Sequence, residues 1–136
     1  MKMKYRGAWA ISEIILYCLF GVFLFAAGWI GTQAYWEANK NNKARADTAM
    51  LSGRISQYRF EVGNYPSSLA NLQNSVGQYG PWLHDLPEDP WSRARSSYSY
   101  FQDANGCVVF SVGKNGASES SVAAGVGGDD VGFFLK

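Results

Sequence analysis

Oxygen-bearing side chains gather in the glycine-rich stretch between Val112 and Asp130. They are Asn115, Ser118, Glu119, Ser120, Ser121, Asp129 and Asp130. Hard oxygen ligands of mixed charge on a flexible loop suit calcium, which accepts roughly six to eight oxygen atoms, backbone carbonyls included. A disordered, solvated loop without a metal accounts for the same composition, so the residues alone leave both interpretations open.

Glu13 is another residue whose type points to a function, because it stands near the start of the apolar run 8–31. A carboxylate in hydrocarbon is costly, so an acidic residue there is a functional candidate by default. Residues 14–30 carry no charge, which approaches the roughly 20 apolar residues that a spanning helix needs. Three basic residues precede the run: Lys2, Lys4 and Arg6. They predict a cytoplasmic N-terminus, with the rest of the chain across the membrane.

Enzymatic chemistry finds little support elsewhere in the chain. His84 is the only histidine, and the sequence pairs no serine or cysteine with it. Asp85, Glu88 and Asp89 have the residue types of a glycosidase pair, but such pairs are defined by geometry, and we interpret them as a solvated loop. The segments GKNG and GVGG do not follow a strand and open a helix, as a phosphate-binding loop does. The basic residues beyond the N-terminus are scattered, so no nucleic-acid interface is expected.

A single long helix must carry the apolar run into the rest of the chain. After the run, residues recur at spacings of three and four along one face: Ala44, Thr48, Leu51, Ile55, Tyr58 and Val62. This pattern predicts an amphipathic helix. The whole helix would extend from about residue 9 to about residue 62, roughly 80 Å at 1.5 Å per residue. Gly63 is the expected stop.

The remaining residues predict a small sheet packed on the second half of that helix. YPSSLANLQ indicates a turn and a short helix, with Ser67 or Ser68 as N-cap. SYSYFQ (97–102) alternates with period two, DANG supplies turn residues, CVVFSV (107–112) is a second strand, and VGFFL closes the chain. The predicted fold class is α+β, with a long N-terminal helix packed on a small antiparallel β-sheet.

The segment KYRGAWAISEIIL resembles the start of type IV pilins and pseudopilins: a basic leader, a small residue, an aromatic residue, then glutamate and a long apolar helix. In that family a leader peptidase cuts after the small residue, the new N-terminus is methylated, and glutamate is the fifth mature residue. Cleavage after Ala8 makes Trp9 the first residue and Glu13 the fifth, whereas cleavage after Gly7 makes Glu13 the sixth. The resemblance therefore implies leader cleavage and N-methylation at Ala8 and Trp9, and a role in assembly for Glu13.

Three further segments resemble the major pseudopilin of type II secretion: GNYPSSLANLQ, GPWLHDLPEDPWSRARSSYSYF and CVVFSVGKNG…GGDDVGFF. In that subfamily the final loop wraps a calcium ion. Carried over position by position, the resemblance implies three kinds of ligand. They are the side chains of Asn115, Asp129 and Asp130, backbone oxygens of Val112 and Ala117, and the hydroxyl of Ser120.

The resemblance also implies an organisation and a function. Residues 1–8 would be a cytoplasmic leader, 9–36 a transmembrane and assembly helix, and 37–136 a periplasmic or extracellular globular domain. The protein would be no enzyme but the subunit of a homopolymeric helical fibre, the major pseudopilin that drives type II protein secretion. Its partners would be further copies of itself, minor pseudopilins, the leader peptidase and the inner-membrane assembly platform. The alternative is a type IV pilin whose surface fibre serves adhesion, motility or DNA uptake.

Overall fold

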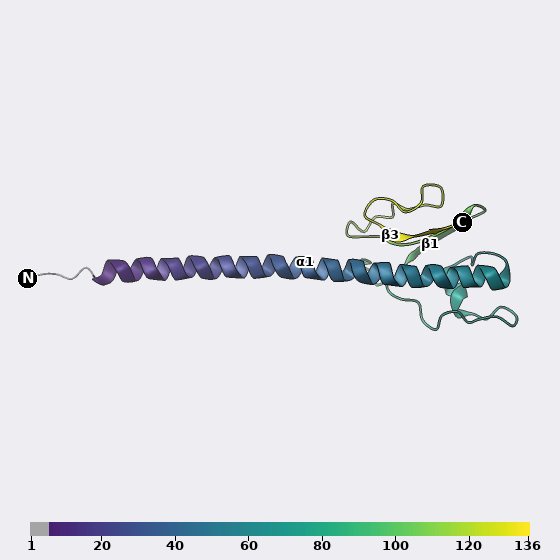
Figure 1. Ribbon diagram of the computed structural model, residues 1–136, viewed down its shortest axis with the longest axis horizontal. Helices are drawn as coiled ribbons and strands as arrows, with labels where there is room; N and C mark the ends of the chain where they lie inside the picture. Colours follow the sequence, from purple (N-terminus) through teal and green to yellow (C-terminus); the bar gives the residue numbers. More distant parts are fainter. Residues whose placement is uncertain (1–5) are drawn as a thin grey trace, which may run out of the picture. The chain divides into compact units, whose positions relative to one another are not determined.

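The computed structural model describes the backbone of residues 6–136 and the side chains of residues 11–136. The elements, in chain order, are the α-helix α1 (Arg6–Val62), the 3₁₀ helix η1 (Leu69–Gln73), and the strands β1 (Ser99–Asp103), β2 (Gly106–Ser111) and β3 (Val131–Leu135) (Figure 1). The chain divides into two compact units, Met1–Ala38 and Asn39–Lys136.

The first unit contains the apolar part of α1. Among the described residues, this is the one helix long and apolar enough to cross a membrane, with a mean hydropathy of 2.2 in its most apolar window. None of that window is buried within the protein. Its large apolar side chains are exposed all round the helix, Ile14, Leu19, Phe23 and Ile30 among them. A helix that is apolar on every face requires lipid or other helices around it.

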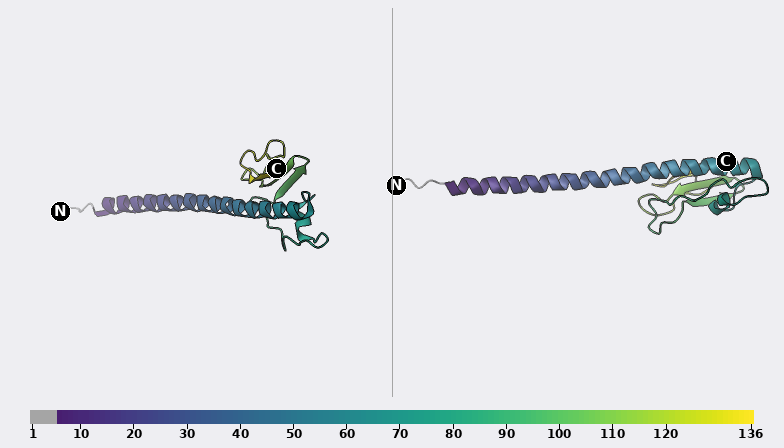
Figure 2. Two further views of the ribbon diagram at one scale, coloured as in Figure 1. Left: turned by 45° about the vertical axis from the view of Figure 1, so that its right-hand side comes forward. Right: turned by 90° about the horizontal axis from the view of Figure 1, so that it is seen from below.

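The second unit is a core built between α1 and the sheet. The helix face predicted from the spacing is confirmed: Ala44, Thr48, Leu51, Ile55 and Tyr58 are buried, and Val62 packs against them in part. The sheet supplies Cys107 and Val109 to the same core. The strands lie along the C-terminal part of α1 in both further views (Figure 2).

The helix ends where the sequence predicts. Gly63 has a φ of +91°, and its N–H donates to the Arg59 carbonyl over 2.9 Å. A left-handed glycine at this position terminates a helix without the strain that a side chain would add. The short helix η1 differs from the prediction, because it is 3₁₀ and Ser68 makes no capping bond. The Ser68 hydroxyl donates instead to the Asn71 side chain over 2.8 Å.

The sheet has the order β1-β2-β3 with both pairs antiparallel. Tyr100 lies opposite Val109, and Val109 opposite Phe133. Within the turn between β1 and β2, the Asn105 N–H donates to the Asp103 carboxylate over 2.7 Å. The predicted α+β class is confirmed. The bounds of β3 are those predicted, whereas those of β1 and β2 differ from the prediction by one or two residues, as is usual at element ends.

Candidate functional site

The loop 112–130 begins and ends at one place on the sheet. Its first residue follows Ser111, the last of β2, and its last precedes Val131, the first of β3. Ser111 and Val131 are paired directly across the two strands. Antiparallel pairing therefore brings the acidic pair Asp129–Asp130 back beside the start of the loop.

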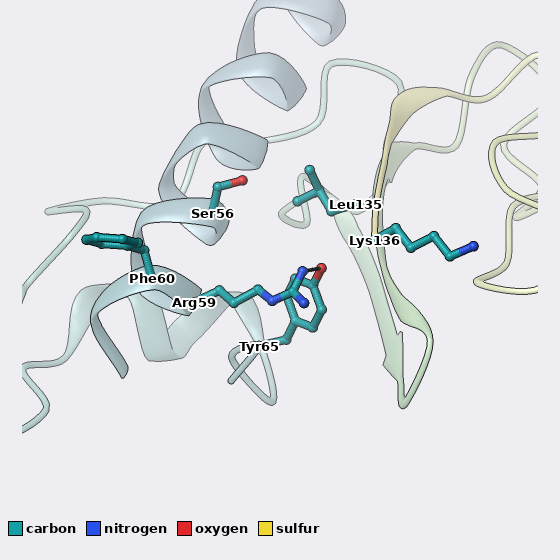
Figure 3. A pocket seen from close by; sticks show the side chains of 6 residues that line it. All are labelled: Ser56, Arg59, Phe60, Tyr65, Leu135 and Lys136. Atoms are coloured by element: carbon teal, nitrogen blue, oxygen red, sulfur yellow. Dashed lines mark hydrogen bonds between the residues drawn. The ribbon is translucent and has the colours of Figure 1, made fainter. Parts of the chain in front are cut away.

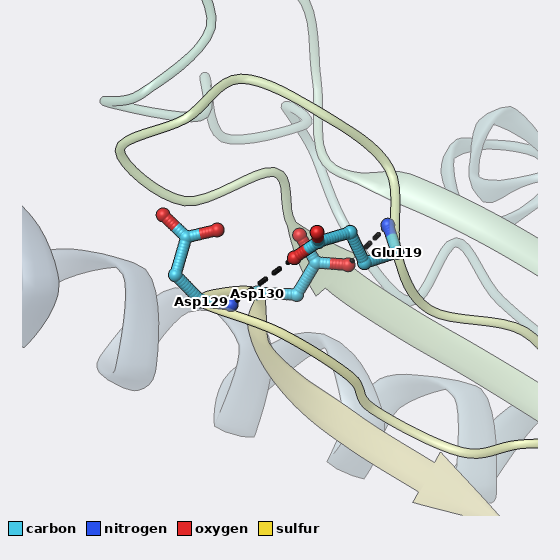
Figure 4. Close-up of side chains that lie close together, drawn as sticks. All are labelled: Glu119, Asp129 and Asp130. Carbon is cyan, nitrogen blue, oxygen red and sulfur yellow. Dashed lines mark hydrogen bonds between the residues drawn. The ribbon is translucent and has the colours of Figure 1, made fainter.

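Three carboxylates converge within this loop. Ligand oxygens of Glu119, Asp129 and Asp130 lie within 4.8 Å of one another (Figure 4). Glu119 and Asp129 are exposed, whereas Asp130 is only 8% exposed. Like charges at this separation repel one another, so the arrangement favours the presence of a cation.

Hydrogen bonds hold the acidic side chains in place. The Glu119 N–H donates to Asp130 Oδ2 over 2.9 Å, and the Ser120 hydroxyl donates to the same oxygen over 2.6 Å. The Asp129 N–H donates back to Glu119 Oε2 over 3.3 Å, so the two limbs of the loop are tied together (Figure 4). Asn115 joins them through its own N–H, which donates to Asp129 Oδ2 over 2.9 Å.

The other oxygen of Asp130 is the unusual atom. Asp130 Oδ1 is buried without a hydrogen-bond partner, and it is the one such side-chain atom among the described residues. Buried polar atoms are almost always paired, because an unpaired one loses its hydration without compensation. An oxygen of this kind beside two more carboxylates is the donor set that a hard cation such as calcium prefers.

Glycines let the loop close tightly around these acids. A Cβ added at Gly128, where φ is +59°, would stand 1.4 Å from Glu119 Oε2. A Cβ at Gly113, where φ is +65°, would stand 2.4 Å from the Asp129 carbonyl oxygen. Both positions require a left-handed backbone and close approach, which glycine alone tolerates without strain.

The six ligands implied by the resemblance all belong to this loop, but their side chains do not all lie with the acidic group. Asp129, Asp130 and Ser120 lie together. The Asn115 side-chain oxygen accepts the Ala117 N–H over 2.7 Å, so Asn115 meets the acids through its backbone. Val112 is tied by its N–H to Asp89 Oδ2, 3.1 Å away.

Glu119 is the member that the sequence prediction left out of the ligand set. It is one of the loop's few carboxylates and stands next to Ser120. These two features are the signal in the sequence that could have marked it as a ligand. Its closeness to Asp129 and Asp130 depends on how the loop folds back on itself.

The residues predicted for processing and assembly lie at the start of α1. Ala8 and Trp9 belong to the first turns of the helix, where the structure describes the backbone but not the side chains. Glu13 is exposed on the helix surface one turn later. The cleavage site, the methylation and the role of Glu13 stay predictions.

The interpretation of the acidic group Asp85, Glu88 and Asp89 is wrong for one member. Asp85, Glu88 and His84 are exposed. Asp89 is only 4% exposed and accepts bonds from the Ser111 hydroxyl over 2.6 Å and the Trp91 N–H over 2.9 Å. A neighbouring N–H and a hydroxyl from the distant end of β2 replace the water that the carboxylate loses, so Asp89 is an internal structural acid.

No catalytic arrangement accompanies the hollows among the described residues. One of them, about 480 Å³, is lined by Ser56, Arg59, Phe60, Tyr65, Leu135 and Lys136 (Figure 3). The Arg59 guanidinium there lies over the Tyr65 ring and donates to its hydroxyl, and the Ser56 hydroxyl donates to the Ser52 carbonyl.

Cys107 lies in the core and is not among the residues that line this hollow. Burial raises the pKa of the Cys107 thiol, which keeps it protonated and unreactive at neutral pH.

Comparison with known proteins identifies the family. No curated protein matches the chain. Residues 33–127 match the family model for protein G of the type II secretion system (T2SS), a stretch that covers well over half of the chain and includes most of the loop 112–130. The family consists of structural pilin-like subunits rather than a known class of enzymes. A long apolar helix, a small antiparallel sheet and this match together show that the chain belongs to the family of type II secretion system protein G, the major pseudopilins.

Proposed function

We propose that this pseudopilin is the structural subunit of a helical fibre that drives protein secretion. The observation that carries the proposal is the exposed apolar surface of α1 in residues 11–36, which none of the residues that the structure describes covers. Before assembly, lipid of the inner membrane covers this surface. In the fibre, α1 helices of other copies would cover it, because a helix apolar on all sides is stable only in such surroundings.

Such a fibre grows by repeating one contact between two different surfaces of the subunit. A heterologous contact of this kind does not close, so it produces a filament. Family membership implies assembly with other components of the secretion system. The minor pseudopilins, the inner-membrane assembly platform and the leader peptidase are the partners that we propose. The basic N-terminus supports a cytoplasmic start and a periplasmic position for the unit Asn39–Lys136.

We assign Glu13 to the register of assembly. Cleavage after Ala8 would leave Trp9 with a charged amine, and Glu13 follows it by about one helical turn. In a bundle of apolar helices that amine requires a counter-charge, which Glu13 of a neighbouring copy supplies. Each charge offsets the desolvation cost of the other, so an entering subunit is stable at one axial position.

We further propose that the loop 112–130 binds calcium. Glu119, Asp129 and Asp130 would hold the ion, with oxygens of Val112, Asn115, Ala117 and Ser120 as further ligands. The unpaired buried oxygen of Asp130 supports this assignment most directly. When bound, the ion supplies positive charge that cancels the repulsion among the carboxylates and ties both limbs of the loop together.

Labelled antibody against this chain and electron microscopy of the parent cells test the fibre proposal. We expect short fibres confined to the periplasm when the chain is made at its ordinary level. Long surface fibres at that level would support the type IV pilin alternative. A chain that stays monomeric in the membrane when all its secretion partners are present would refute both.

A further inference from the structure

Asp89 is a buried carboxylate to which the proposed function gives no role. Its Oδ1 accepts the Ser111 hydroxyl and the Trp91 N–H, and its Oδ2 accepts the Val112 N–H over 3.1 Å. Bonds from three donors to one carboxylate are strong and directional, because the acceptor is charged. Asp89 therefore ties its own segment, at Trp91, to the end of β2 at Ser111 and Val112.

Two of its partners mark the point where the loop 112–130 leaves the sheet. Ser111 ends β2 and Val112 begins the loop 112–130. The next residue, Gly113, is buried and so close to Asp129 that a Cβ there would lie 2.8 Å from the Asp129 carboxyl carbon. Fixing Val112 therefore fixes the backbone against which Asp129 rests.

The segment that carries Asp89 is itself anchored to α1. The Trp91 indole N–H donates to the Asn41 side chain over 3.1 Å, and the Lys40 ammonium lies 4.9 Å from the centre of the Trp91 ring. Lys43 Nζ also donates to the Glu88 carbonyl over 3.2 Å. All of these residues belong to the unit Asn39–Lys136. The segment that carries Asp89 is thus fixed to α1, and the Asp89 carboxylate in turn fixes the start of the loop 112–130.

We propose that Asp89 is a positioning residue for the calcium site: it holds the Val112–Gly113 end of the loop in its ligand-binding geometry without contacting the ion. The inference rests on the calcium binding proposed above. Without the Asp89 bond, the start of the loop gains conformational freedom. Part of the binding free energy must then be used to order it, and the affinity falls.

Calcium titration of the full-length chain in detergent micelles, by calorimetry well below the melting temperature, tests this role. Asp89→Asn keeps the shape of the side chain but turns one acceptor oxygen into a donor. We expect its Kd for calcium to rise by about tenfold or more, the usual effect of removing a group that orients ligands from outside. Asp85→Asn removes the same charge from an exposed position of the same segment, and its Kd should equal that of the wild type.

The outcomes separate this inference from the calcium proposal. If the wild type binds no calcium, the calcium proposal fails and the positioning role with it. If the wild type binds and Asp89→Asn binds equally well, only the positioning role is refuted, whatever the melting temperature of the variant in chelator. If Asp89→Asn does not fold, Ser111→Ala decides, because it loosens the carboxylate and leaves the Val112 bond. We expect a smaller rise in its Kd, and an unchanged Kd would overturn the inference.

Discussion

The substitution Asp130→Asn should have opposite effects in the two buffers. Relative to the wild type, the variant should be less stable in calcium and at least as stable in chelator. In chelator the wild type keeps a buried charge with one unpaired oxygen, close to two more carboxylates. Asp130→Asn removes that charge. Its amide oxygen can still accept the Glu119 N–H and the Ser120 hydroxyl in place of Oδ2. In chelator we therefore expect the variant to be at least as stable as the wild type.

The sizes of the two effects follow from the geometry and from mass action. Two unit charges 4.8 Å apart repel by about 1 kcal/mol in water and about 3.5 kcal/mol at an effective dielectric constant of about 20. Glu119 and Asp129 are exposed, so the lower value applies to the repulsion that the variant relieves. Calcium at a hundredfold excess over Kd should stabilise the wild type by about 2.7 kcal/mol. In a domain of about 100 residues this corresponds to a rise of about 10–20 °C in Tm.

Scanning calorimetry of the full-length protein in detergent, with excess chelator or with millimolar calcium, measures both effects. The wild type should melt higher in calcium, and Asp130→Asn should melt at one temperature in both. Asp85→Asn, an exposed substitution of the same type, should respond to calcium as the wild type does. A variant Asp130→Asn that gains as much from calcium as the wild type would show that Asp130 is no ligand. A wild type that ignores calcium would show that the loop holds none.

The remaining predictions concern processing, assembly and the core. Mass spectrometry of the mature protein should show residues 1–8 missing and Trp9 methylated; an intact leader in an assembled fibre would contradict the pilin-type processing. Glu13→Ala should leave the protein inserted in the membrane but lower the fibre yield, since stranding one charge of a buried pair costs about 3–5 kcal/mol; an unchanged yield would exclude the pairing. Leu51→Ala, at a fully buried position, should lower the free energy of unfolding by about 2–5 kcal/mol. Met50→Ala, at an exposed position on the same helix, should lower it by less than about 1 kcal/mol.

The helix was the most predictable part of the fold because its signal is local and long. Every third or fourth residue from Ala44 to Val62 is apolar or small, and one face of a helix is the only regular structure that collects them. Gly63 marks the end for an equally local reason, its left-handed backbone. The 3₁₀ form of η1 was not predictable, because the choice between helix types in five residues depends on what packs around Leu69 and Leu72.

The loop 112–130 likewise has one feature that the sequence predicts and one that it does not. Composition identifies it as a source of oxygen ligands, and antiparallel pairing accounts for Asp129 lying near Val112. Which carboxylates meet is decided by the path of the loop between them. Glu119 reaches the Asp129 backbone because Gly128 leaves room for it. A steric allowance of this kind leaves no periodic pattern in the sequence.

Asp89 shows most clearly why composition alone misleads about charged residues. Within the sequence it is the last of several acids in a segment broken by prolines, where solvation is the ordinary expectation. Two of its hydrogen-bond donors lie 22 and 23 residues further along the chain, at the end of β2. No short stretch of sequence around Asp89 contains these donors. The cost of burying the carboxylate is offset only when the fold brings them into hydrogen-bonding distance. The dependence is mutual: the segment at Asp89 is anchored by the end of β2, and the start of the loop 112–130 is anchored by Asp89. Loosening either contact should therefore loosen the other, and through this coupling we expect a residue outside the proposed ligand set to change the calcium affinity of the loop.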